Sequence, residues 1–269
     1  MANYNLLMIG AGRMAEAIVS GLRNKEETAF NSITVSNKSD QERLSKLKTK
    51  YQVHTTSDWK SVVHKSDVII LAAPPSAHEA LFSELSNHLD KQLIITVAAG
   101  IDPSTMEVHL PEDTPVCWFM PNTAALIGKS MTTFACGKSI EHHHRKIIEH
   151  ILSSIGEYEE LTEQQVHDLT AVTGSAPAFL YLVTEALQET AKEYGLTNEQ
   201  AKRLVTKMIS GSAAMLETGT NADELRAQVT TPGGSTAAGV SVLEEQSLKK
   251  IIKDAIIATN EHARKSTKE

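Results

Sequence analysis

Cysteine is scarce in this sequence. Only Cys117 and Cys136 occur among the 269 residues, and there is no CxxC pair. A disulfide-stabilised framework is therefore not expected. A reducing compartment, the cytoplasm, is the expected location. Both cysteines lie in apolar runs with no histidine partner recognisable in the sequence, so we interpret them as buried structural thiols.

Long apolar runs and an excess of positive charge are also absent. No apolar run approaches the roughly 20 residues that a membrane helix needs, and residues 1–5 lack the basic region of a signal peptide. The net charge of −7 gives no electrostatic support for binding nucleic acid or an anionic membrane. We interpret the run His142, His143 and His144 as a solvated helix face and not as a metal site, because adjacent helical residues point in different directions.

What the sequence does contain is an alternation of short apolar runs with helical patterns over residues 1–160. Continuous apolar runs such as Val68–Leu71 are typical of strands buried on both faces of a parallel sheet. Beyond residue 162 the strand signal ends, and only helical patterns follow. We therefore expect a doubly wound α/β domain over residues 1–160 and an all-helical domain over residues 161–269.

The expected elements follow from these patterns. Strands are expected at Leu6–Ile9, Ile33–Ser36, Val53–Thr55, Val68–Ala72, Leu93–Val97, Val116–Phe119, Met131–Ala135 and Tyr158–Leu161. Helices are expected in the second half at 163–172, 176–194, 198–218, 221–229, 236–245 and 247–265. Thr197 and Gln200 form a capping-box pattern at the start of the helix over 198–218, and Gly195 is a typical stop for the helix before it.

A glycine motif joins the first expected strand to a helix. Gly10-Ala11-Gly12-Arg13-Met14-Ala15 reads GxGxxA. Gly10 permits a tight turn, Gly12 lets a diphosphate approach the backbone, and Ala15 lets the helix pack on the strand. The helix N-terminus then supplies N–H donors and positive potential. The motif in this context predicts a dinucleotide site in a Rossmann-type domain; the alternative is a turn with only a packing role.

The end of the second strand bears on which dinucleotide binds. Enzymes that use NAD usually carry a carboxylate there, whereas this chain has Ser36, Asn37 and Lys38. These neutral donors and the cation favour NADPH, with NADH left as an alternative. Asp40 could approach the ribose, but we interpret it as the N-terminal residue of the next helix.

The carboxyl ends of the strands expected at Val68–Ala72 and Leu93–Val97 are expected to line the nicotinamide side, because ligands lie at the carboxyl ends of parallel strands. Small residues there let a flat ring approach the backbone. Asn122, after another strand, offers a donor and an acceptor near the same edge. The cofactor-binding candidates are Gly10, Ala11, Gly12, Arg13, Met14, Ser36, Asn37, Lys38, Ala72, Ala73, Pro74, Ala98 and Asn122.

A second glycine turn precedes the helix expected at 236–245. The sequence there is Pro232-Gly233-Gly234-Ser235-Thr236. Backbone N–H groups of residues 233–236 would converge into an anion pocket suited to a carboxylate, with the Thr236 hydroxyl at its rim. The alternative is that Ser235 or Thr236 simply caps the helix. The substrate-binding candidates are Val229, Thr230, Gly233, Gly234, Ser235 and Thr236.

Taken together, the segments GAGRMAEAI, AAGI, FMPNTAALIG, TGSAPAF and VTTPGGSTAAGVSVLEE resemble the pyrroline-5-carboxylate reductase family in order and spacing. The resemblance covers nearly the whole chain. It implies an NAD(P)H-dependent oxidoreductase that reduces 1-pyrroline-5-carboxylate to L-proline, the last step of proline biosynthesis. It also implies a helical domain that dimerises, with oligomers of dimers common. By the same resemblance, residues 233–236 hold the substrate carboxylate, and the catalytic candidate Thr236 hydrogen-bonds the imine nitrogen.

The chain also departs from the family pattern. Pro74 stands where the family usually has lysine, and Trp118 stands where it usually has arginine. Two cations are thus lost, which keeps two alternatives open: a non-enzymatic nucleotide-binding paralogue and a reductase of a related cyclic imine. A β-hydroxyacid dehydrogenase is disfavoured, because it would be expected to carry a catalytic lysine on the long helix after its glycine motif, and residues 178–191 contain none.

Overall fold

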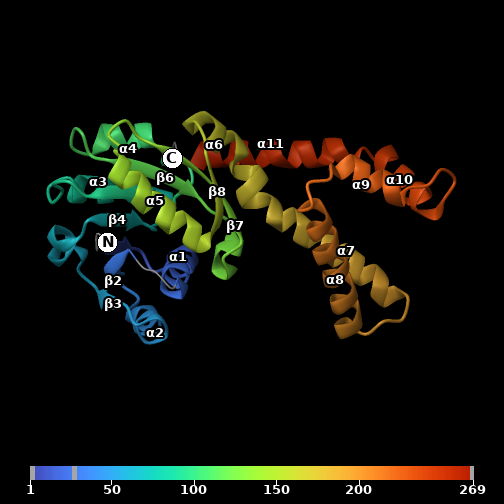
Figure 1. The fold of residues 1–269 in the computed structure, drawn as a ribbon, viewed down its shortest axis with the longest axis horizontal. Coiled ribbons are helices and arrows are strands. Elements are labelled where there is room, and N and C mark those ends of the chain that lie inside the picture. Colours follow the sequence, from blue (N-terminus) through green and yellow to red (C-terminus); the bar gives the residue numbers. More distant parts are fainter. Residues whose placement is uncertain (1–3, 26–28, 267–269) are drawn as a thin grey trace. The chain divides into compact units, whose positions relative to one another are not determined.

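The fold is taken from a computed structural model that describes residues 4–25 and 29–266. The chain divides into two units (Figure 1): residues 1–175 with 259–269, and residues 176–258. The first unit holds all the described strands, and the second is helical. The architecture expected from the sequence, a doubly wound α/β domain followed by helices, is confirmed.

Within the described residues, eight strands form one sheet in the order β3-β2-β1-β4-β5-β6-β7-β8. The six pairs other than β6–β7 are parallel, and β6 pairs with β7 antiparallel. From β1 the chain first adds β2 and β3 on one side and then β4 to β8 on the other, so the direction in which strands are added reverses between β1 and β4. Sheets of this kind bind ligands at that point. The strands are β1 (Tyr4–Ile9), β2 (Phe30–Ser36), β3 (His54–Thr56), β4 (Val68–Leu71), β5 (Leu93–Thr96), β6 (Val116–Met120), β7 (Ser130–Cys136) and β8 (Gly156–Glu160).

Helices cover both faces of the sheet. Against one face pack α1 (Arg13–Asn24), α2 (Gln41–Tyr51) and α5 (His142–Ile155), and against the other pack α3 (His78–Leu85), α4 (Pro103–His109) and α6 (Glu163–Thr170). Alternate residues of one strand enter different cores: Met8 joins the first and Leu7 the second. Both faces of the central strands are buried, which accounts for their continuous apolar runs.

The second half contains the expected helices. They are α7 (Ala176–Glu193), α8 (Asn198–Leu216), α9 (Ala222–Val229), α10 (Ser235–Glu245) and α11 (Leu248–Ser266). The capping box of Thr197 and Gln200 is confirmed: each side chain accepts a hydrogen bond from the other residue's backbone N–H. Gly195 has φ +90° just beyond α7, so its predicted role as a helix stop is also confirmed.

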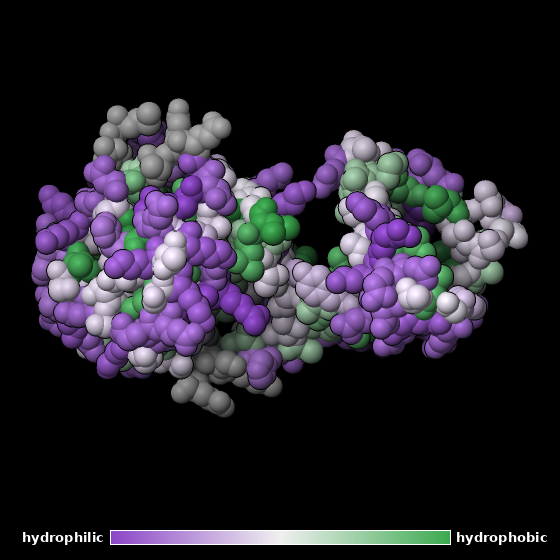
Figure 2. Space-filling model, turned by 90° about the horizontal axis from the view of Figure 1, so that it is seen from below, coloured by the Kyte–Doolittle hydropathy of each residue, from purple (hydrophilic) through white to green (hydrophobic). Residues whose placement is uncertain are grey.

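Residues 176–258 bury few of their own side chains. Of the described residues in α7, α9 and α10, none is buried. Large apolar side chains stand exposed among hydrophilic ones on this unit (Figure 2); they include Leu180, Tyr181, Leu182, Val183, Met208, Met215, Leu216, Val242, Leu243, Ile251 and Ile252. An apolar surface of this extent is typical of a protein–protein interface. No helix over the described ranges is both long and apolar enough to cross a membrane.

The histidine run needs one correction. The interpretation of His142, His143 and His144 as a solvated helix face is wrong for His144, which is buried. Its Nδ1 accepts a hydrogen bond from the backbone N–H of Glu141 and so caps α5. Burial, together with the neighbouring His143, lowers the pKa of His144, although the Glu141 carboxylate opposes this. The neutral side chain therefore belongs to the helix cap.

The contact between α1 and α5 gives a stability prediction. A Cβ placed on Gly21 would lie 2.3 Å from the Ser154 carbonyl oxygen, so no side chain fits between the two helices. We expect Gly21→Ala to lower the free energy of unfolding by about 1–3 kcal/mol, measured by urea denaturation. Ser20→Ala, one residue earlier in α1, is the control. An unchanged midpoint for Gly21→Ala would show that the helices are not in close contact.

Candidate functional site

The predicted nucleotide loop forms at the carboxyl end of β1. Gly10 has φ +112°, and a Cβ there would lie 2.4 Å from the Ala72 carbonyl oxygen, so this turn admits only glycine. Gly12 precedes the first residue of α1, and a Cβ on it would meet nothing within 4 Å. The first turn of α1 leaves its N–H groups without helical acceptors, and the loop leaves room beside Gly12 for a phosphate.

Residues after β2 lie beside this loop. The Gly10 N–H donates to the Ser36 carbonyl at 2.9 Å, which ties the two strand ends together. Asn37 Oδ1 accepts from the backbone N–H groups of Ser39 and Asp40, and Lys38 is exposed. The Asp40 carboxylate accepts from the N–H of Arg43 at 2.8 Å and caps α2, which confirms that it is the helix N-terminal residue.

The ends of β4 and β5 are adjacent because these strands pair directly. The Ala72 N–H donates to Ile9 at 2.8 Å, and the Val97 N–H donates to Leu71 at 3.2 Å. Ala73 and Pro74 continue the first of these ends, and the buried Ala98 continues the second. The structure therefore brings the ends of β2, β1, β4 and β5 to one edge of the sheet.

Asn122, the remaining cofactor candidate, is already well bonded. Its Oδ1 accepts from the Ala124 N–H at 2.9 Å, and its Nδ2 donates to the Thr173 carbonyl at 3.1 Å. Its own N–H donates to Ser130 Oγ at 3.0 Å. The side chain thus links two sequence motifs, 119–128 and 173–179, that lie far apart in the chain. Its geometry explains a structural role directly, and a role in cofactor binding stays a prediction.

A cation that sequence reasoning missed lies on the nucleotide loop. Arg43 Nε donates to the Ala11 carbonyl at 2.8 Å, and its guanidinium pairs with Glu16 in the first turn of α1. Lys50 and the Tyr51 hydroxyl also bond Glu16, at 3.0 and 2.9 Å. Burial alone would raise the pKa of Glu16, but the hydrogen bonds from Lys50, Arg43 and Tyr51 outweigh it and lower the pKa to about 2. Glu16 is therefore ionised, and it anchors Arg43 against the loop.

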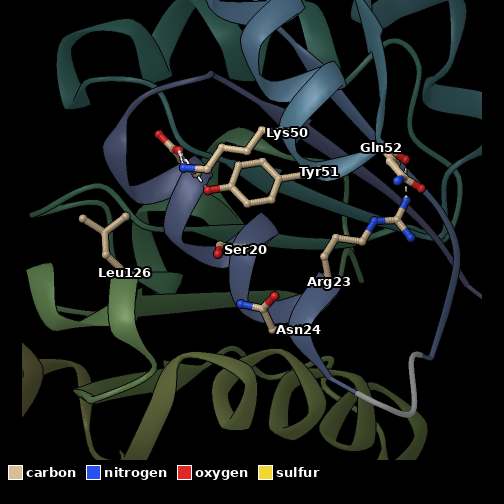
Figure 3. Close-up of a pocket in the computed structure, with 8 residues that line it drawn as sticks. Ser20, Arg23, Asn24, Lys50, Tyr51, Gln52 and Leu126 are labelled. Atoms are coloured by element: carbon tan, nitrogen blue, oxygen red, sulfur yellow. Dashed lines mark hydrogen bonds and ion pairs between the residues drawn. The ribbon is translucent and has the colours of Figure 1, made fainter.

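A surface pocket of about 950 Å³ lies next to this cluster (Figure 3). It is lined by Glu16, Ser20, Arg23, Asn24, Lys50, Tyr51, Gln52 and Leu126. None of the predicted cofactor residues lines it, and Arg23 points across to the Gln52 carbonyl, to which it donates at 3.0 Å. This hollow is therefore separate from the nucleotide loop.

The predicted carboxylate loop precedes α10. Gly233 has φ +73°, and the Gly234 N–H donates to the Thr231 carbonyl at 2.9 Å, so that amide is used within the turn. Helix α10 begins at Ser235, so Ser235 and Thr236 lie in its first turn, where N–H groups have no helical acceptor. Neither residue occupies the capping position, which Gly234 holds. Thr230 donates its hydroxyl to the Arg226 carbonyl, and Val229 is exposed at the end of α9.

The histidine, cysteine and acidic side chains form no metal site in the ranges that the structure describes. The described part of the chain holds no group of three or more His, Cys, Asp or Glu side chains placed to bind an ion. Cys117 and Cys136 are free thiols with their Sγ atoms 3.8 Å apart across the β6–β7 pair. Cys117 is buried as predicted, whereas Cys136 is half-buried.

Comparison with known proteins places the chain in a family. Over 263 residues it is 36% identical to pyrroline-5-carboxylate reductase 1 of Bacillus spizizenii, which covers 97% of this chain and 87% of that protein. The chain belongs to the pyrroline-5-carboxylate reductase family. Residues 163–266 match the family model described as pyrroline-5-carboxylate reductase dimerisation, and residues 5–100 match the model described as NADP oxidoreductase, coenzyme F420-dependent.

Solved structures of the reductase family have the same fold. A pyrroline-5-carboxylate reductase from Coxiella burnetii superimposes with a TM-score of 0.87 at 32% identity, covering 98% of both chains. A pyrroline carboxylate reductase from Plasmodium falciparum, solved with NADP bound, has a TM-score of 0.87 at 25% identity and covers 99% of both chains. The likeness therefore extends through both units.

The Glu16 cluster predicts a specific dependence of stability on pH. A carboxylate with a lowered pKa stabilises the fold above its unfolded value of 4.5, and this contribution is lost as the pH falls toward about 2. We expect Glu16→Gln to cost about 1–2 kcal/mol of unfolding free energy at pH 7. The difference from the parent protein should shrink below pH 4.5. Urea denaturation across pH measures it, with Glu42→Gln, from an exposed pair with Lys46, as the control. Equal behaviour of the two variants would contradict the prediction.

Proposed function

We propose that this protein reduces 1-pyrroline-5-carboxylate to L-proline with NADPH, the last step of proline biosynthesis. The observation that carries the proposal is family membership along nearly the whole chain, at 36% identity over 97% of it. The glycine motif at residues 10–15 and the Pro-Gly-Gly turn at 232–234 both lie within that length. Pro74 and Trp118, which stand where the family usually has lysine and arginine, both lie outside these two segments.

The cofactor proposal rests on residues that fit a dinucleotide phosphate. The glycine loop and the start of α1 offer amides to a diphosphate. Ser36, Asn37 and Lys38 offer donors and a cation to a 2′-phosphate, while the nearby Asp40 carboxylate is already engaged as the α2 cap. The family model matched by residues 5–100 is named for NADP, and the Plasmodium relative was solved with NADP bound. We propose NADPH as the cofactor, with NADH as the weaker alternative.

The substrate proposal rests on the turn before α10. The amides of Gly233, Ser235 and Thr236 are proposed to bind the substrate carboxylate, and the Gly234 amide supports the turn through its bond to Thr231. When bound, the reduced nicotinamide supplies the hydride that carbon 5 of the ring accepts. The Thr236 hydroxyl is proposed to donate a hydrogen bond to the imine nitrogen. Because this hydroxyl is a weak acid, the proton that remains on nitrogen comes from water or from an iminium that binds already protonated.

The association proposal rests on the helical unit. The exposed apolar side chains of α7, α8 and α10 and the match to a dimerisation model support a homodimer or an oligomer of dimers. We also propose a functional division into a cofactor-binding domain, residues 1–160, and a dimerisation and substrate domain, residues 161–269. β8 ends at Glu160, and the dimerisation model begins at residue 163. A cytoplasmic location is proposed from the low cysteine content.

The activity itself is tested by the absorbance of NADPH in the presence and absence of 1-pyrroline-5-carboxylate. We expect substrate-dependent loss of the NADPH band, and slower turnover when NADH replaces NADPH. Identifying L-proline as the product completes the assay. NADPH binding without turnover would instead support the non-enzymatic paralogue, and turnover only of other cyclic imines would support the related reductase.

Thr236→Ala tests the assignment of the catalytic hydroxyl. We expect turnover to fall about tenfold to a hundredfold, because one donor to the reacting nitrogen is lost. The dissociation constant for NADPH should stay near that of the parent protein. Ser241→Ala, later in the same helix, is the control, since the Ser241 hydroxyl bonds Glu245 on the helix surface. Steady-state kinetics on both variants gives the answer; unchanged turnover would remove Thr236 from the mechanism.

A further inference from the structure

A buried histidine joins the ends of β4 and β5. His78, the first residue of α3, is fully buried, and its Nδ1 lies 3.0 Å from the Pro74 carbonyl oxygen. Its Nε2 lies 2.9 Å from Oγ1 of Thr96, the last residue of β5 and also fully buried. Because a carbonyl only accepts hydrogen bonds, Nδ1 carries the ring proton. Burial lowers the pKa of His78 despite its backbone hydrogen bonds, so the ring is neutral and Nε2 is an acceptor.

This tautomer fixes the direction of the next bond. The hydroxyl of Thr96 has one proton, and it goes to His78 Nε2 at 2.9 Å rather than to the Leu71 carbonyl at 3.5 Å. The oxygen of the same hydroxyl accepts from the Ala98 N–H at 3.2 Å. A single chain of hydrogen bonds therefore runs from the backbone of Ala98 to the backbone of Pro74.

The carbonyl group of Ala98 is hydrogen-bonded by a residue of β6. Trp118 is fully buried, and its Nε1–H donates to the Ala98 carbonyl at 2.8 Å. The indole is held in turn by His167, whose ring lies 4.6 Å away and whose Nε2 lies 2.8 Å from Asp102. Both polar backbone groups of Ala98 thus bond to buried side chains. We call His78, Thr96 and Trp118 the strand-end clamp.

We propose that the strand-end clamp holds Pro74 and Ala98 in the backbone shape that binds the nicotinamide half of NADPH. This inference rests on the proposed function, in which the ends of β4 and β5 line that half of the cofactor. Buried hydrogen bonds of this kind are costly to break, because a partner left behind stays unsatisfied. The clamp residues are positioning residues: they are buried beneath the segments that are proposed to contact the cofactor.

The test measures NADPH affinity directly, by fluorescence titration of the purified full-length protein. Thr96→Val keeps the shape of the side chain but removes both hydroxyl bonds, and Trp118→Phe removes the donor to Ala98. We expect each to raise the dissociation constant for NADPH about fivefold to tenfold. Thr96→Ser, which restores the hydroxyl, should stay within about twofold of the parent protein.

Matched variants separate positioning from loss of stability. Thr114→Val removes a buried hydroxyl that donates to the Pro111 carbonyl before β6, and Trp59→Phe changes the chain's other tryptophan. Both should bind NADPH normally even where thermal unfolding shows a comparable loss of stability. If Thr96→Val does not fold, the comparison of Trp118→Phe with Trp59→Phe decides the question.

His78→Asn tests whether the hydrogen bonds from Ala98 to Pro74 act as a unit. An asparagine amide can still donate to Pro74 but no longer reaches Thr96, so it breaks the same bond as Thr96→Val. Combining the two substitutions should raise the dissociation constant no further than the larger single effect. If the parent protein binds NADPH and both Thr96→Val and Trp118→Phe bind it with the same affinity, this inference is overturned and the proposed function still stands. Failure of the parent protein itself to bind NADPH would overturn the proposed function, and this inference with it.

Discussion

The structure depends on how closely β1 approaches β4 at their carboxyl ends. Gly10 leaves β1 with its backbone against Ala72, and no side chain fits between them. This contact fixes where the chain turns into α1, so it also fixes where the amides of that helix point. Because the strand order reverses at the same place, the ends of β2 and β5 lie to either side of it. The proposed cofactor site follows from this single approach of two backbones.

Most of the fold could be predicted because its signals are local in sequence. Apolar runs such as Val68–Leu71 identified the strands, and the amphipathic period with the cap at Thr197 identified α8. The antiparallel direction of β7 was not predicted, since strand direction depends on the path of the connection and not on composition. Similarly, His144 was assigned to the surface, because residues 142–144 contain no signal that distinguishes a capping histidine from its solvated neighbours.

The candidate site shows the same division between local and distant information. Short motifs were enough to predict the tight turn at Gly10 and the role of Asp40 as the cap of α2. Arg43 was missed because it reaches the loop from another helix, across a separation of 32 residues to Ala11. The strand-end clamp was missed for the same reason. Trp118 lies in the apolar run Val116–Phe119, so its burial follows from the pattern, but its hydrogen bond to the backbone of Ala98 is a role that no pattern around residue 118 reveals.

The helical unit has a different energetic basis from the sheet. Its helices α7, α9 and α10 bury none of their described side chains within one chain, so packing inside a single copy contributes little to their stability. In the proposed homodimer, most of their folding free energy would come from covering the exposed apolar surface with the other copy. Folding and assembly are then one equilibrium, and mass action applies to both. Dilution would then act on the helical unit as a denaturant does, and the unfolding temperature of that unit would rise with protein concentration.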